Sequence, residues 1–81
     1  MKLITQNGYF IATPIKAENG IYQCRIINAM SNYIRNGQRI TLSGKTGQVV
    51  LVPMDKALTT KVDKKDMLIC HDSDILAVLE E

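Results

Sequence analysis

The residues best suited to chemistry lie side by side near the C-terminal end of the chain. Cys70 precedes His71, and the carboxylates Asp72 and Asp74 follow. A cysteine with a histidine can form a nucleophilic pair or bind a metal, and two carboxylates can share acid–base work. However, adjacent side chains of a strand point to opposite faces, so Cys70 and His71 would not act on the same atom. The other cysteine, Cys24, stands far away in the sequence without CxxC spacing. This set therefore predicts no metal site and no catalytic centre.

The same residues have structural interpretations. Cys24 and Cys70 both lie inside apolar runs, which favours two buried, reduced cysteines that behave as small hydrophobic residues. A disulfide between them stays open as an alternative that no spacing supports. Asp72 and Asp74 share a polar turn, where carboxylates commonly accept hydrogen bonds from local backbone N–H groups.

One glycine-rich segment, residues 43–47, has the letters of a phosphate-binding loop but not its spacing. A P-loop requires a glycine five residues before Gly44, and Arg39 occupies that position. The segment also lies between two predicted strands rather than before a helix. It is better interpreted as a hairpin turn. We therefore predict no cofactor, and a protein that is not an enzyme.

The composition describes one small globular domain. The chain has 81 residues, of which 46% are hydrophobic and 22% charged, with a formal net charge of +2. This charge is too small to indicate a membrane or nucleic-acid partner, and the mixed charges of residues 61–66 are typical of a solvated turn. No run approaches the roughly 18 apolar residues of a membrane span, and the first residues do not resemble a signal peptide. We expect an intracellular protein.

A nucleic-acid-binding barrel is a weaker alternative. Base stacking needs aromatic side chains on an exposed basic face. The basic residues do not cluster beside the aromatic ones, which are Tyr9, Phe10, Tyr22 and Tyr33. Aromatic residues of this kind belong more often to the core.

Short apolar or alternating runs separated by turn residues predict an all-β fold. The expected strands are residues 9–15, 21–27, 38–42, 48–53, 58–62, 67–70 and 75–79. Pro14 should end the first of them, because proline cannot donate to a ladder, and residues 16–20 should form a short loop. Residues 28–37 are irregular, and Tyr33 and Ile34 are expected to pack this stretch on the core. About seven short strands with regular turn signals predict a small barrel or sandwich.

The closing segment also carries a family resemblance. Residues 66–80 resemble the C-terminus of the small co-chaperonins of the GroES type, in which a strand, a short acidic turn and a final hydrophobic strand follow one another. Residues 8–14, 18–22 and 34–42 are more weakly similar to other segments of that family, in the same order. The resemblance implies a single GroES-like β-barrel domain over residues 1–81.

This resemblance implies a function in binding. Family members form heptameric rings that cap the folding chamber of a large chaperonin, and a mobile loop carries a hydrophobic tripeptide to the chaperonin. The corresponding chaperonin-binding residues here would be Gly20, Ile21 and Tyr22. In the ring, the C-terminal strand of one subunit pairs with the N-terminal segment of its neighbour. The implied interface residues are Leu3, Ile4, Ile75, Leu76, Ala77, Val78 and Leu79.

Elementary energetics agree with an oligomer. Burial of each large apolar side chain of the last run would contribute about 1.5–3 kcal/mol, yet a barrel this small cannot easily cover both faces of its last strand. A neighbour's strand around Leu3 and Ile4 would cover it and pair its free edge. We therefore expect a homo-oligomeric ring, a heptamer by resemblance.

Two departures from the family leave a second function open. Only residues 16–20 stand where the family has a long mobile loop, and the hairpin that roofs the family's dome is shortened to part of residues 28–36. The chain is therefore either a compact co-chaperonin, cellular or viral, or a GroES-like barrel reused as an assembly subunit, for example of a virus particle. The expected location is accordingly the cytoplasm, a host cytoplasm or a virion.

Overall fold

Strands make up most of the chain in the computed structural model, which describes residues 5–29, 32–41 and 44–80. These residues form eight strands, one 3₁₀ turn and no α-helix, which confirms the predicted all-β class. The elements are β1 (Tyr9–Glu18), β2 (Ile21–Ala29), β3 (Asn32–Arg35), β4 (Gln38–Thr41), β5 (Val49–Pro53), β6 (Leu58–Val62), β7 (Lys65–His71), the turn η1 (Asp72–Asp74) and β8 (Ala77–Leu79).

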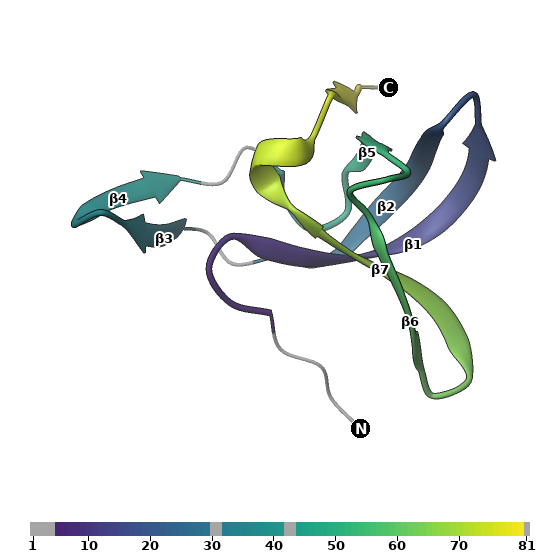
Figure 1. Cartoon of the computed structure of the whole chain (residues 1–81), viewed down its shortest axis with the longest axis horizontal. Helices are drawn as coiled ribbons and strands as arrows, with labels where there is room; N and C mark the ends of the chain where they lie inside the picture. The colour runs from purple at the N-terminus through teal and green to yellow at the C-terminus, as the bar shows by residue number, and fades with distance from the viewer. Residues whose placement is uncertain (1–4, 30–31, 42–43, 81) are drawn as a thin grey trace.

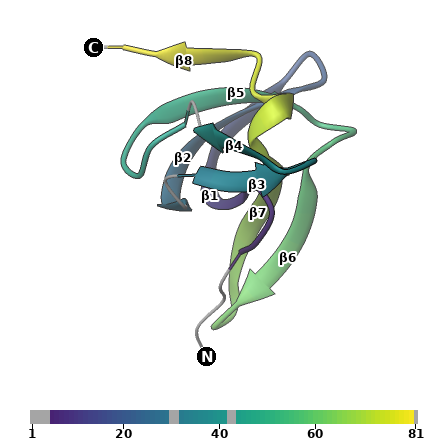
Figure 2. The same cartoon turned by 90° about the vertical axis from the view of Figure 1, so that its left-hand side faces the viewer.

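Six of the strands form one antiparallel sheet in the order β6-β7-β1-β2-β5-β8, while β3 and β4 pair as a separate ribbon. The sheet curls into a small barrel, and the β3–β4 ribbon lies at the opposite end of the molecule from the β1–β2 and β6–β7 hairpins (Figure 1). The view turned by 90° shows β8 along β5, at the edge of the sheet (Figure 2).

The core follows from the alternation of the strands. Side chains at alternate positions of the four central strands point inward and form one buried cluster: Phe10, Ala12, Cys24, Ile26, Val50, Val52, Leu68 and Cys70. Both cysteines are buried and free, so their predicted role as small hydrophobic residues is confirmed. A hydrogen bond with the Cys24 thiol, together with burial, raises the pKa of the Cys70 thiol above its usual range. Cys70 is therefore a protonated core residue rather than a nucleophile.

The β1–β2 hairpin corrects one prediction. Pro14 does not end the first strand, and residues 16–18 are part of β1 rather than of a loop. A register shift between Pro14 and Lys16 explains the difference, because a proline at a bulge has no ladder hydrogen bond to lose. The connection is reduced to Asn19 and Gly20, whose φ values of 54° and 77° suit a type I′ turn.

The β3–β4 ribbon corrects a second prediction. The stretch expected to be irregular contains the strand β3, which pairs with β4, itself expected as a strand over residues 38–42. The turn between them lies at Asn36 and Gly37, again with positive φ. Tyr33 is half-buried, and its ring lies 5.6 Å from that of His71 rather than against the core cluster. Ile34 does not pack on the core either, because its side chain is 69% exposed. Neighbouring residues of a strand point to opposite faces, so the two could not both pack on the same surface.

Candidate functional site

The predicted chaperonin-binding residues lie together at the tip of the β1–β2 hairpin. Gly20 occupies the turn, and Ile21 and Tyr22 begin β2. Strand β2 is paired on both edges here, since Ile21 stands opposite Glu18 on β1 and Pro53 on β5. The tip is therefore a fixed part of the sheet.

The side chains of Ile21 and Tyr22 point to opposite faces of the sheet. Tyr22 is half-buried and packs against the core cluster, beside its cross-strand neighbour Val52. Ile21 lies on the other face, where it lines a groove. Gly20 leaves open space around its Cα, and its φ of 77° explains the choice of glycine. Of the predicted residues, Ile21 is the apolar side chain on the outer face.

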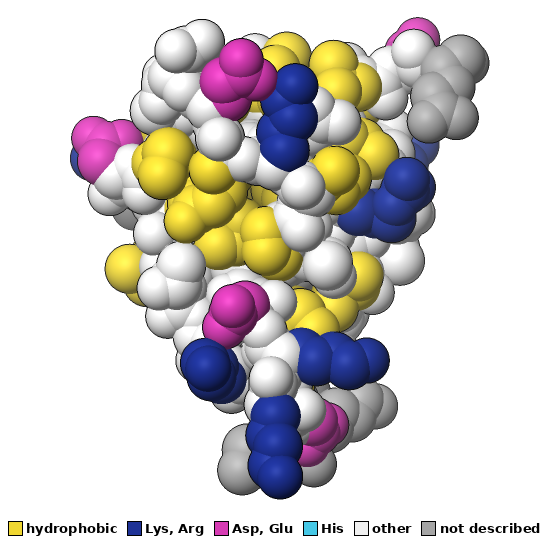
Figure 3. Space-filling model, turned by 90° about the vertical axis from the view of Figure 1, so that its right-hand side faces the viewer, with side chains coloured by type: hydrophobic (Ala, Val, Ile, Leu, Met, Phe, Trp, Pro, Cys, Tyr) yellow, Lys and Arg dark blue, Asp and Glu magenta, His cyan; other side chains and the backbone are white. Residues whose placement is uncertain are grey.

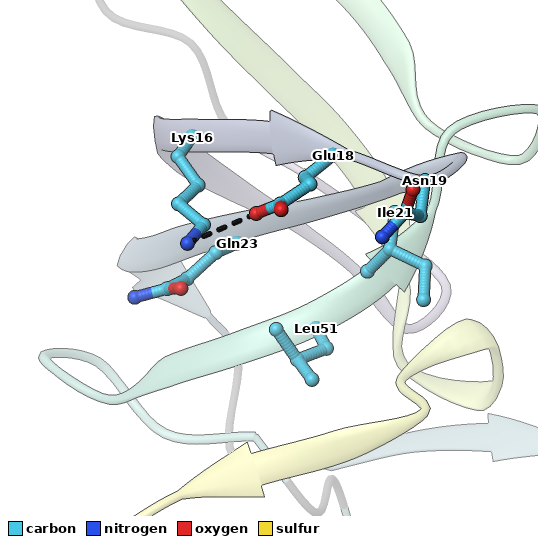
Figure 4. Close-up of a pocket in the computed structure, with 6 residues that line it drawn as sticks. All are labelled: Lys16, Glu18, Asn19, Ile21, Gln23 and Leu51. Atoms are coloured by element: carbon cyan, nitrogen blue, oxygen red, sulfur yellow. Dashed lines mark ion pairs between the residues drawn. The ribbon is translucent and has the colours of Figure 1, made fainter.

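The groove beside Ile21 is shallow and open, with a volume of about 250 Å³. Lys16, Glu18, Asn19, Ile21, Gln23 and Leu51 line it, with Leu51 contributed by β5 (Figure 4). The Lys16 Nζ and a Glu18 carboxylate oxygen lie 3.0 Å apart on its upper rim. Both side chains are exposed, so this ion pair contributes little to stability. The groove thus combines two aliphatic side chains with a polar rim.

His71 has a structural role at the other end of the barrel. Its Nδ1 accepts a hydrogen bond from the Ser73 backbone N–H at 3.1 Å, which caps η1. Its Nε2 lies 2.9 Å from the Asn7 carbonyl oxygen and must donate to it, since a carbonyl only accepts. The ring also meets Tyr9 and Tyr33 edge-on, at centroid distances of 4.8 and 5.6 Å. His71 therefore joins the N-terminal turn, β3 and η1.

Asp72 also joins distant parts of the chain. Its Oδ1 accepts a hydrogen bond from the Gly44 backbone N–H at 2.9 Å, a partner remote in sequence. Gly44 is closely surrounded, because an added Cβ would lie 2.7 Å from Ile26 and 2.9 Å from Ile75. The acidic turn thus fixes the start of the segment that leads to β8.

Strand β8 contains most of the predicted interface residues. It pairs with β5 within the same chain, with Val78 opposite Val50 and Leu79 opposite Val49. Its second edge pairs with no other strand in the described part of the chain. Val78 packs on the core, whereas Leu76 and Leu79 are 57% and 41% exposed. The structure thus brings residues 75–79 together, while Leu3 and Ile4 lie outside the described residues.

Comparison with known proteins decides the family. Residues 4–79 match the family model described as "Chaperonin 10 Kd subunit". The chain is 37% identical over 77 residues to the co-chaperonin GroES of Psychrobacter arcticus, covering 94% of this chain and 80% of the relative. It is 34% identical over 70 residues to the co-chaperonin GroES of Brevibacillus choshinensis, covering 85% and 74%. The chain belongs to the chaperonin 10 family. It is a co-chaperonin and acts by binding, not as an enzyme.

The groove of this chaperonin 10 protein contains one residue, Leu51, that the sequence did not indicate. Leu51 lies beside Gln23 only because β5 pairs with β2, and a single sequence carries no signal for that pairing. Among the residues described, no group of three histidine, cysteine or acidic side chains could hold a metal ion. No helix within the same residues is long and apolar enough to cross a membrane.

Proposed function

We propose that this chaperonin 10 protein caps a large chaperonin and contacts it through the tip of the β1–β2 hairpin, at Gly20, Ile21 and Tyr22. The observation that carries the proposal is the position of Ile21, which places an aliphatic side chain beside an open groove at this tip. Tyr22 supports the tip from the core side. We place the protein in the cytoplasm, as its family resemblance implies.

The contact would be preformed. A flexible loop loses conformational entropy when it orders on a partner, whereas a hairpin already paired on both edges loses little. Both edges of Ile21 are paired in this chain. The short connection therefore reaches less far than a long mobile loop but is more rigid. This suits a cap whose body comes close to its partner.

We further propose that the subunits assemble as a homo-oligomeric ring, a heptamer by family resemblance, through β8. Among the residues described, its second edge pairs with no strand, and Leu76 and Leu79 are exposed. Both observations support this assignment, because a neighbour's strand could pair the edge and cover the two leucines. We assign that strand to the neighbour's N-terminal segment around Leu3 and Ile4.

A pull-down with a chaperonin–ATP complex tests the cap. The wild-type chain should be retained, and Ile21→Ser should abolish retention because it removes the aliphatic side chain from the groove. Ile34→Ser is the matched control, since Ile34 is more exposed but lies on the β3–β4 ribbon at the opposite end of the molecule (Figure 1). A wild-type chain that assembles but does not bind would contradict the proposed contact at the hairpin tip.

A further inference from the structure

A second groove lies at the C-terminal end of β8. Its volume is about 410 Å³, and its lining residues come from β2, from the start of β5 and from the end of β8: Arg25, Gly47, Gln48, Val49, Leu79 and Glu80. The strand register agrees, because Arg25 stands opposite Val49 and Val49 opposite Leu79. Cross-strand partners point to the same face, so the three side chains form one row. This row lies on the outer face, since the adjacent Val50 and Val78 pack in the core.

The groove has a carboxylate on the side of the free sheet edge. Glu80 follows β8 directly and is exposed, and among the residues described it forms no ion pair. Arg25 lies on the opposite side, two strands away from that edge, and its Nη1 donates a hydrogen bond to the Gly47 carbonyl oxygen at 2.9 Å. A strand added to β8 would therefore meet the carboxylate first, and it should bring a cation.

The apolar end of the molecule lacks such an unmatched charge. The end that carries the β1–β2 and β6–β7 hairpins shows hydrophobic side chains gathered in its centre, with lysine, arginine and acidic side chains around them (Figure 3). Two of these hairpin lysines already have carboxylate partners, Lys16 with Glu18 and Lys61 with Asp66. The carboxylate of Glu80 at the groove thus has more to gain from a neighbour's cation.

Residues 1–4 of a second copy have the composition and the length for this place. Their sequence is Met-Lys-Leu-Ile, one lysine among apolar residues. Thr5 is only 8% exposed, so it belongs to its own subunit and leaves about four residues to reach a neighbour. Four extended residues span about 13 Å, enough to pair with the three residues of β8.

The alternation of side chains decides which of these residues points inward. Within β8 only Val78 packs on the core, whereas Ala77 and Leu79 are exposed. Leu3 opposite Val78 would extend the core row and leave Lys2 and Ile4 on the outer face. A shift by one residue would turn Lys2 inward and bury its charge, which is costly.

The charges then decide the direction of the added strand. In the antiparallel direction Lys2 stands opposite Leu79, beside the Glu80 carboxylate, and Ile4 stands opposite Ala77. In the parallel direction Ile4 would lie beside Glu80, and Lys2 would be at the other end of β8. Only the antiparallel arrangement brings the lysine to the groove.

We propose that the groove at the end of β8 receives the Lys2 side chain of a neighbouring subunit, whose first residues add to β8 as an antiparallel strand with Leu3 opposite Val78. This inference rests on the proposed ring and defines the register of its contact. The ammonium group of Lys2 pairs with the carboxylate of Glu80, while the aliphatic part of its side chain covers Leu79.

Cysteine cross-linking tests the register. Lys2→Cys with Leu79→Cys in one chain places two thiols opposite each other across the interface, at a Cα separation that a disulfide spans. With a copper catalyst in air, each thiol pair gives two electrons and two protons to dioxygen, and a non-reducing gel should show a ladder of joined subunits. Ile4→Cys with Leu79→Cys, the pair that a parallel strand would join, should stay largely monomeric on the same gel. The native Cys24 and Cys70 are buried and do not interfere.

A charge exchange tests the ion pair. Lys2→Glu or Glu80→Lys alone should raise the concentration for half assembly about fivefold at low salt, the scale of an exposed ion pair. The double variant, with both changes, should assemble like the wild type. Glu18→Lys is the matched control, because Glu18 is an exposed acid at the hairpin tip, and it should leave assembly unchanged. A sizing column coupled to a mass measurement follows all four.

The outcomes separate this inference from the proposed ring. If the wild type is a monomer at every concentration, the ring fails and the inference with it. If the ring forms but only Ile4→Cys with Leu79→Cys cross-links, the added strand is parallel, and the inference is refuted while the contact at β8 stands. A ring in which neither pair cross-links assigns the contact to another surface and refutes the inference. A double charge variant that assembles no better than the single ones refutes the pair of Lys2 with Glu80.

Discussion

The tip of the β1–β2 hairpin and the strand β8 are both short apolar segments of the same sheet, but they are held differently. At the tip, Ile21 is paired on two edges and the turn has two residues. Strand β8 has three residues and pairs only with β5 among the residues described. The exposed Leu76 precedes it, and the exposed Leu79 is its last residue. The difference matches the two kinds of contact proposed above, a preformed face at the tip and an unfinished sheet edge at β8.

Removal of the unfinished edge should have the largest effect. Deletion of residues 77–81 removes the strand that a neighbour would pair with, so the proposed ring should dissociate into monomers. A sizing column coupled to a mass measurement checks this result. Leu79→Ser is a milder companion, because it keeps the strand and removes one exposed apolar side chain. An elution volume unchanged by the deletion would refute the interface at β8.

Two glycines of the chain differ in how closely their surroundings are packed, so their substitutions should differ in their effect on stability. Gly8 and Gly20 both have positive φ, but a Cβ on Gly8 would lie 2.7 Å from Tyr33 and 2.8 Å from His71, whereas Gly20 has open space. Gly8→Ala should lower the free energy of unfolding by about 2–4 kcal/mol, from backbone strain and overpacking together. Gly20→Ala should cost about 1 kcal/mol, from strain alone. Urea denaturation measures both, and equal losses would contradict the close packing described around His71.

The rim of the groove should contribute least. Lys16→Ala breaks the exposed ion pair with Glu18 and should change the free energy of unfolding by less than about 0.5 kcal/mol. Urea denaturation curves of this variant and the wild type should therefore nearly coincide. A loss above 1 kcal/mol would show that the hairpin tip depends on this pair for its rigidity.

The sequence predicted what local patterns determine. Short apolar or alternating runs such as residues 21–27 predicted strands, and the turn residues between the runs predicted the connections. Pro14 misled the prediction, because its bulge depends on the register with β2, which no local pattern reveals. For the same reason the sequence did not indicate that β1 continues to Glu18 and leaves only a two-residue turn.

The candidate site was less predictable than the fold. Ile21 could be named from the family resemblance, but Leu51, which lines the same groove, comes from a distant strand. Likewise, the role of His71 depends on Asn7 and Tyr33, which reach it only in the folded chain. Contacts of this kind follow from strand order, and one sequence without structure does not define that order.

The central claim is that a preformed hairpin face lets this ring bind a chaperonin. The most direct test is the mass of the assembly, measured under native conditions with and without a GroEL-type chaperonin and ATP. We predict a homo-oligomer alone and a complex of ring and chaperonin when both are present, with the complex lost in Ile21→Ser while the ring persists. A chain that stays a ring but forms no complex at concentrations of chaperonin that saturate its known relatives would contradict the claim.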